Sequence, residues 1–161
     1  MAEDDTSRSR NQRRHRELDG VLSGSGAVLQ HLDSCYGRRG TPPGTVVALA
    51  LDEDCVLLGQ GRARDLKAVV SPIQMHGVLD TLIGDLVSDP RGAATDNVLL
   101  VRVRSGPPSP TESDLAWWSA LVAACRTRAL LPGELICRTR LRWHALQAHT
   151  SGSLARAAAD G

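Results

Sequence analysis

The amino-acid sequence predicts an α/β domain, and three observations support that prediction. Residues 45–51 and 98–101 are short apolar runs containing β-branched residues, as buried strands are. Between and after these runs lie stretches with apolar residues at steps of three and four, the period of a helix. Clusters of Gly, Pro, Asp and Ser separate the segments. Strands that alternate with helices favour a sheet covered by helices.

The bulk composition bounds the functions that the chain can have. It has 161 residues, enough for one domain with a workable core, and a formal net charge of +1. So small a charge argues against strong overall attraction to nucleic acid or to a membrane surface. No apolar run approaches the roughly 18 residues of a membrane span, and the polar start is unlike a signal peptide. We therefore expect a cytoplasmic protein with no membrane partner, whose four cysteines are reduced and lack zinc-ribbon spacing.

The first 16 residues predict a disordered tail, because they hold no aliphatic side chain beyond Met1 and Ala2. An acidic start is followed by five arginines that form a candidate nucleic-acid-binding arm: Arg8, Arg10, Arg13, Arg14 and Arg16. Such an arm would contact phosphates. A short charged run is also what an ordinary solvated tail contains, and this simpler interpretation stays open.

Residues 17–44 predict an N-terminal helical segment followed by a linker. Apolar residues recur at helical steps as far as Tyr36, although Ser-Gly-Ser-Gly at 23–26 interrupts them. Two short helices and one frayed helix are both compatible with this pattern. Residues 37–44, which include Pro42 and Pro43, predict a turn.

Residues 45–149 are expected to form the main domain. The runs 45–51 and 55–58 predict a β-hairpin around an acidic turn, and 66–70 predicts a third strand. Ser71 is then a good N-cap, and Pro72 a good first residue, for a helix over 73–87. This helix would turn one apolar stripe to the core: Ile73, Val78, Leu79, Leu82, Ile83 and Leu86.

The segment from Asn97 to Leu130 organises the predicted domain. Its strand must end before the prolines at 107, 108 and 110, which lack a backbone donor. Thr111, with Asp114 three residues later, predicts a capped start for a helix over 111–129. We expect this helix to bury one face, made of Leu115, Trp118, Leu121, Val122 and Cys125. Trp117 would then point elsewhere, either half covered by a neighbouring element or free as an anchor for a partner.

The C-terminal region completes the α/β pattern. Residues 134–137 predict a strand, after which Arg138, Arg140 and Arg142 alternate with uncharged residues. This period of two is typical of an edge strand with one charged face. Residues 150–161 predict a flexible tail. The five histidines have no metal-binding spacing, so we expect them to be exposed or partly buried.

The loop after the central strand, Ser-Gly-Pro-Pro-Ser-Pro, is the basis of a family resemblance. Residues 97–114 resemble the metal-binding core of the JAB/MPN (JAMM) metalloprotease fold, most closely its bacterial RadC-like branch. That family's signature is His-x-His, seven residues, Ser, two residues, Asp. Laid without gaps on this sequence, the histidines fall on Val101 and Val103, the serine on Thr111 and the aspartate on Asp114. The resemblance implies a three-layer, cytidine-deaminase-like mixed sheet flanked by helices.

The same resemblance implies that the metal ligands have been lost. Valine has no lone pair to bind zinc, and Asp114 alone does not make a catalytic site. Shifting the alignment by one residue puts Arg102 and Arg104 at the histidine positions, where their permanent charge repels a cation. The glutamate that the family's enzymes use as a base has its nearest counterpart around Gln60, which is not basic. We therefore expect neither a metal nor another cofactor.

Two functions of different classes stay open. The first is a catalytically inactive JAB/MPN-like, RadC-like domain that serves as a scaffolding module and binds protein or nucleic acid. Its candidate interaction residues are Arg102, Arg104, Trp117, Arg138, Arg140 and Arg142. Among these, Arg102 and Arg104 are expected on the face of the strand opposite the two valines. The second is a hydrolase with a non-standard active site around Asp114, assisted by a histidine that the fold brings near it.

Overall fold

The computed structural model describes residues 21–22, 24–67 and 70–154. They form one six-stranded mixed sheet with the strand order β2-β1-β3-β4-β5-β6. The strands are β1 (Thr45–Leu51), β2 (Leu57–Ala63), β3 (Asn97–Val103), β4 (Leu131–Arg138), β5 (Arg142–Ala145) and β6 (Thr150–Ser153). Only β3 and β4 pair in parallel; the other neighbours are antiparallel. The predicted α/β class is confirmed.

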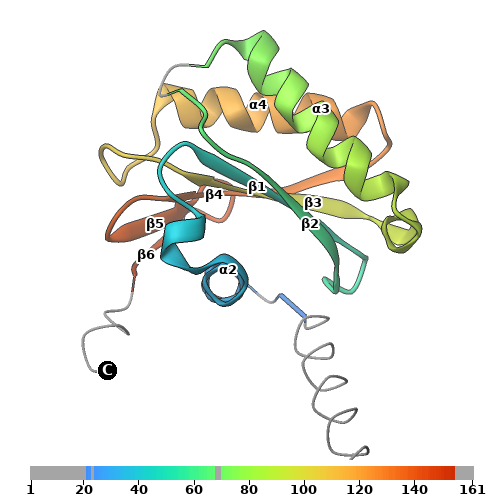
Figure 1. Cartoon of the computed structure of the whole chain (residues 1–161), viewed down its shortest axis with the longest axis horizontal. Helices are drawn as coiled ribbons and strands as arrows, with labels where there is room; N and C mark the ends of the chain where they lie inside the picture. The colour runs from blue at the N-terminus through green and yellow to red at the C-terminus, as the bar shows by residue number, and fades with distance from the viewer. Residues whose placement is uncertain (1–20, 23, 68–69, 155–161) are drawn as a thin grey trace, which may run out of the picture.

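Helices cover both faces of this sheet (Figure 1). The helices α3 (Pro72–Ser88) and α4 (Glu112–Arg126) lie together on one face, and α2 (Ser25–Gly40) lies on the other. A short 3-10 helix, η1 (Pro90–Ala94), follows α3. Two separate apolar cores result, one between the sheet and α3/α4 and the other between the sheet and α2. No helix in the described part of the chain is long and apolar enough to cross a membrane.

The central strand β3 divides its side chains between these two cores. Val98 and Leu100 pack in the core under α3 and α4, whereas Val101 and Val103 pack in the core under α2. Successive side chains of a strand point to opposite faces, so residues 102 and 104 continue the α4 side. The side chain of Arg102 accordingly reaches α4. This alternation decides which residues can form a site.

Both predicted helix starts are confirmed as capping boxes. The Ser71 hydroxyl accepts from the backbone N–H of Gln74, whose side chain in turn accepts from the Ser71 N–H. Thr111 and Asp114 form the same reciprocal pair at the start of α4. Each box satisfies two backbone donors that the first turn of a helix leaves without partners. These starts could be predicted because they depend on residues only three apart.

Several expected boundaries were wrong. The second arm of the hairpin begins at Leu57 and continues through the Gly-Gln-Gly stretch to Ala63. Of the third strand expected over 66–70, the described residues 66, 67 and 70 are not strand, and residues 68–69 lie outside the described residues. The Leu66 N–H instead donates to the carbonyl of Gly44, whose φ of 89° suits glycine. Helix α2 extends to Gly40, into the region 37–44 expected as a turn, although Gly37, with a φ of 67°, kinks it at the start of that region. Residues 150–153 of the expected C-terminal tail form an edge strand, β6, and residues 155–161 lie outside the described residues.

The buried faces of two helices also differ from the prediction. In α3, Ile73 is 85% exposed, and Met75 occupies the core position instead. In α4, Trp117 is fully buried, Leu115 is exposed and Trp118 is half-buried. The buried face of α4 contains Asp114, Trp117, Ala120, Leu121, Ala124 and Cys125. A polar residue thus belongs to this face, which apolar periodicity alone does not reveal.

Candidate functional site

The most unusual polar feature of the fold is a buried carboxylate, Asp114. It is the third residue of α4, directly behind the Thr111 cap, and it is completely inaccessible to solvent. The capping box points its side chain back toward the N-terminus of the helix. The start of α4 faces the end of β3, so the carboxylate lies against the last side chains on the α4 side of that strand. An ionised carboxylate in such a place must be paired.

Four hydrogen bonds hold the two oxygens of Asp114. Oδ1 accepts from Arg102 Nη1 at 2.5 Å and from Arg104 Nε at 2.9 Å. Oδ2 accepts from Arg104 Nη2 at 2.7 Å and from the backbone N–H of Thr111 at 3.0 Å. A carboxylate has about four acceptor positions, so Asp114 is saturated. The pairing with Arg104 is bidentate, the strongest arrangement for these two groups.

Arg104 also organises the loop that joins β3 to α4. Its Nη1 donates to the carbonyls of Ser105 and Pro107, and its Nη2 donates to the carbonyl of Ser109. The proline-rich loop therefore wraps around the guanidinium, with Gly106 at a φ of 101° in its tight turn. One arginine thus fixes the loop and the helix start together.

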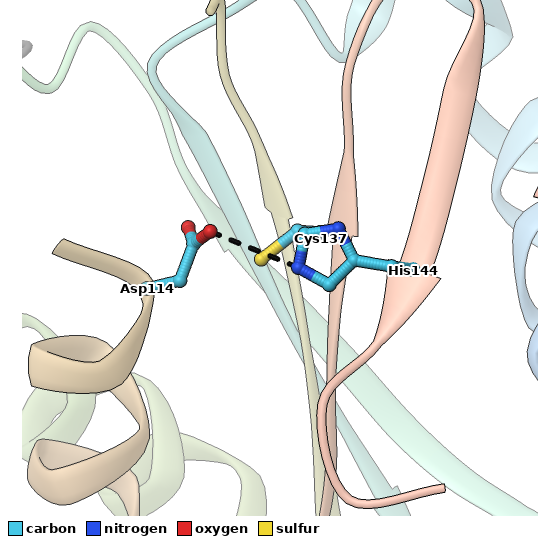
Figure 2. A group of neighbouring side chains, drawn as sticks. All are labelled: Asp114, Cys137 and His144. Carbon is cyan, nitrogen blue, oxygen red and sulfur yellow. Dashed lines mark ion pairs between the residues drawn. The ribbon is translucent and has the colours of Figure 1, made fainter. Parts of the chain in front are cut away.

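Two further side chains converge on Asp114 from neighbouring strands (Figure 2). Cys137 in β4 and His144 in β5 are directly paired in the strand register, and both are buried. His144 Nε2 lies 3.7 Å from Asp114 Oδ2, too far for a hydrogen bond. Among the described residues, neither ring nitrogen of His144 has a hydrogen-bond partner. His144 is therefore a buried imidazole beside a carboxylate whose acceptor positions are already filled.

Burial and pairing set the protonation states of this cluster. Burial by itself raises the pKa of Asp114, but the hydrogen bonds from Arg104, Thr111 and Arg102, with the adjacent Cys137 thiol, outweigh it and hold that pKa well below its usual range. Burial strongly raises the pKa of the Cys137 thiol, and the negative charge of Asp114 raises it further. Asp114 is therefore ionised, and Cys137 is a neutral thiol that is a poor nucleophile.

Asp114, Cys137 and His144 are close enough together to be tested as a metal site. Their ligand atoms all lie within 4.8 Å of one another. Two features argue against a cation there. The oxygens of Asp114 are already used by two guanidinium groups, whose positive charge lies where an ion would bind, and the thiol would have to lose its proton. The residues present do not fit a zinc ion.

The structure brings together only some of the residues that the sequence singled out. Arg102, Arg104, Thr111 and Asp114 meet in one cluster, whereas Val101 and Val103 lie on the opposite face of β3 and do not share a cleft with Asp114. The alignment without gaps, which put the family's histidines on Val101 and Val103, is therefore wrong, because these positions face away from Asp114. The expectation that these two arginines form a basic surface is also wrong, because each is only 8% exposed.

The remaining candidate interaction residues also separate. Trp117 is a core residue, not a surface anchor. The three arginines expected along one edge strand instead flank a turn: Arg138 ends β4, Arg140 lies in the turn and Arg142 begins β5. Arg138 is buried and donates to Asp33 of α2 at 2.6 Å. Arg140 and Arg142 are exposed. The candidate arm from Arg8 to Arg16 lies outside the described residues.

Sequence reasoning missed the contributions of Cys137 and His144. His144 was expected at or near the surface, yet it is 6% exposed and lies in the cluster. The only sign of their role in the sequence is weak: an apolar strand that contains a cysteine is followed, after a turn, by a histidine. Only the register between β4 and β5 places the two side by side. Cys125 is buried as predicted, whereas Cys55, in the turn of the β1–β2 hairpin, is exposed.

No protein-family model matches this chain, and no curated protein is similar enough in sequence to count as a relative. The interpretation of the site therefore depends on its own geometry and chemistry.

Proposed function

We propose that this chain is a RadC-like JAB/MPN-type domain in which two arginine side chains occupy the place of the metal ion, and that it functions as a binding module rather than a hydrolase. The observation that carries the proposal is the saturated carboxylate of Asp114, held by Arg102 and Arg104. In this proposal the ion pairs keep the helix start and the loop in place, which a bound metal would do in the active relatives.

The spacing of the clustered residues supports this relationship. The family's signature has seven residues between His-x-His and Ser, then two before Asp. Here Arg102-x-Arg104 is followed by six residues, Thr111, two residues and Asp114. A loop one residue shorter than the family's would align the two arginines with the histidines while Thr111 and Asp114 keep their positions. A mixed sheet with helices on both faces is compatible with the same fold.

The chemistry of the cluster supports a loss of catalysis. Zinc hydrolases need about three protein ligands and an open position for water, and the ion lowers the pKa of that water. Guanidinium groups have no lone pair to offer a metal and no accessible proton equilibrium near neutral pH. Gln60, near the expected place of the family's base, is not basic, and its Oε1 lies 2.6 Å from Nε2 of His31. Neither a metal-bound water nor a carboxylate base is available for hydrolysis by that route.

Zinc titration of the purified full-length protein, followed by calorimetry, tests this proposal. We expect no stoichiometric heat of binding, and no difference between the wild type and Asp114→Ala in the zinc that each retains after dialysis. One equivalent of zinc bound by the wild type and lost in Asp114→Ala would show that the carboxylate is a ligand, and would refute the proposal.

A hydrolase with a non-standard site around Asp114 is the second candidate, because His144 Nε2 lies 3.7 Å from Asp114 Oδ2. Its weakness is that Asp114 has no free acceptor with which to orient the ring, and that the adjacent thiol is neutral. A panel of ester, peptide and phosphoester substrates discriminates between the two. Turnover by the wild type that disappears in His144→Ala, with the variant still folded by circular dichroism, would favour the enzyme. We expect no turnover.

A further inference from the structure

We infer that a cavity beside the Asp114 cluster binds an extended polypeptide segment that carries acidic and apolar side chains in alternation. This inference rests on the proposed function and names the partner of the binding module. The cavity has a volume of about 860 Å³ and lies between the end of α2, the loop after β3 and the turn between β4 and β5. That volume is in the range of ligand-binding clefts.

The charges around the cavity are all of one sign. Four arginines line it, and no acidic residue of the described chain does. Two of them already have an acidic partner: Arg104 pairs with Asp114, which it shares with Arg102, and Arg138 pairs with Asp33. Arg140 and Arg142 are exposed, and neither makes an ion pair or a side-chain hydrogen bond within the described part of the chain. These two guanidinium groups are therefore available to an anion, and a carboxylate can accept from such a fork in a bidentate manner.

Several of the residues that line the cavity are apolar. Pro42, Pro108 and Val103 contribute to its lining, and Leu141 stands between the two available arginines with 68% of its surface exposed. An exposed leucine flanked by arginines suits a ligand that alternates apolar and acidic groups, as an extended peptide does with its period of two. The hairpin turn is itself well held, because the Thr139 N–H and hydroxyl both donate to the carbonyl of Arg142.

The lining favours a peptide over a nucleic acid. Proteins that bind single strands stack the bases on aromatic side chains, and none of the residues that line this cavity is aromatic. Duplex binding depends on many phosphate contacts, whereas only two arginines here lack an acidic partner. The net charge of +1 gives no additional long-range attraction to a polyanion.

Selection from a random twelve-residue peptide library displayed on phage, with the full-length protein as bait, tests the inference. We expect the selected sequences to share Asp or Glu next to Leu, Ile, Val or Pro, and a labelled copy to bind in a fluorescence anisotropy titration. A consensus without acidic residues, or no consensus after repeated selection, would overturn the inference.

Matched variants locate the binding site. Arg140→Glu/Arg142→Glu should weaken binding of the selected peptide at least about tenfold. The control, Arg64→Glu/Arg126→Glu, changes two exposed arginines outside the cavity, and takes the formal net charge from +1 to −3 just as the test variant does. It should change affinity by no more than roughly twofold. Leu141→Ser should weaken binding several-fold without any change of charge. Equal losses in the test and control pairs would mean nonspecific attraction and would refute the site.

Two further measurements separate this inference from the function on which it rests. A labelled twelve-nucleotide single-stranded DNA should neither bind at the peptide's affinity nor displace it; displacement of the peptide by that DNA would overturn the choice of partner. Mass spectrometry of the peptide after incubation should find it intact. Cleavage of the peptide would refute the proposal that the domain is inactive, but not the proposal that the cavity binds peptide. Failure to bind peptide would refute the peptide site, but would not affect the conclusion drawn from the zinc titration.

Discussion

Asp114 and Arg104 form a buried bidentate ion pair that joins the first turn of α4 to the end of β3, with N–O distances of 2.9 and 2.7 Å. Each residue also has a second structural role. Asp114 closes the capping box of its helix, and Arg104 holds three carbonyls of the intervening loop. Because these roles share the same two side chains, we expect the helix start, the loop and the strand end to form one cooperative unit.

Asp114→Asn should lower the free energy of unfolding by about 3–5 kcal/mol, because it leaves two buried guanidinium groups without a counter-charge. Urea denaturation measures this. Asp80→Asn is the matched control: it removes the carboxylate of another Arg–Asp pair, with Arg128, in which Asp80 is 56% exposed, and it should cost no more than about 1 kcal/mol. Similar losses in the two variants would contradict a special role for Asp114.

The stability advantage of the wild type over Asp114→Asn should shrink in acid. The pKa of Asp114 is lowered in the folded protein, whereas in the unfolded chain it is about 3.9. Below that value the unfolded chain binds a proton that the folded chain does not, so folding loses up to ~1.4 kcal/mol per pH unit from this group. Unfolding titrations between pH 7 and pH 3 should give a constant difference above about pH 5 and a falling one below about pH 4. A difference that stays constant to pH 3 would show that the carboxylate is not preferentially ionised in the fold.

Arg102→His/Arg104→His should create a zinc site. If the two arginines stand at the positions of the family's histidines, the shorter imidazoles and Asp114 supply three ligands and leave space for an ion. Calorimetry should then detect about one equivalent of zinc, and adding Asp114→Ala to the double variant should abolish it. A double variant that is folded by circular dichroism yet binds no zinc would argue against the proposed relationship to the metalloprotease fold.

The two adjacent tryptophans of α4 should differ in their contribution to stability. Trp117 is 1% exposed and packs in the core under α3 and α4, whereas Trp118 is half-buried. Trp117→Ala should cost about 3–5 kcal/mol because it leaves a large cavity, and Trp118→Ala should cost less than about 2 kcal/mol. Thermal and urea unfolding measure both. The reverse order would mean that the helix presents its other face to the sheet.

Local signals predicted those parts of the fold that depend on neighbouring residues. The strand expected around residues 98–101, the proline-rich loop and the capped start of α4 at Thr111 all follow from residue types within a few positions of one another. The capping box even identified Asp114 as a residue with a structural role. Boundaries that depend on distant partners, such as the extension of β2 to Ala63 along β1, were missed.

Residue types alone were enough to show that Thr111 and Asp114 begin a helix directly after a strand and a tight loop, because these interactions span only about three to ten residues. Which face of β3 meets that helix depends instead on how the distant elements pack together. Side chains alternate along a strand, so a change of one position exchanges Val101 and Val103 for Arg102 and Arg104. The β4–β5 hairpin sets Cys137 beside His144, and the parallel pairing of β3 with β4, which puts Arg102 opposite Cys137, brings both residues to the carboxylate. Arg102 and Arg104, which were expected on a basic surface, are buried there and hold the loop and the helix start in place.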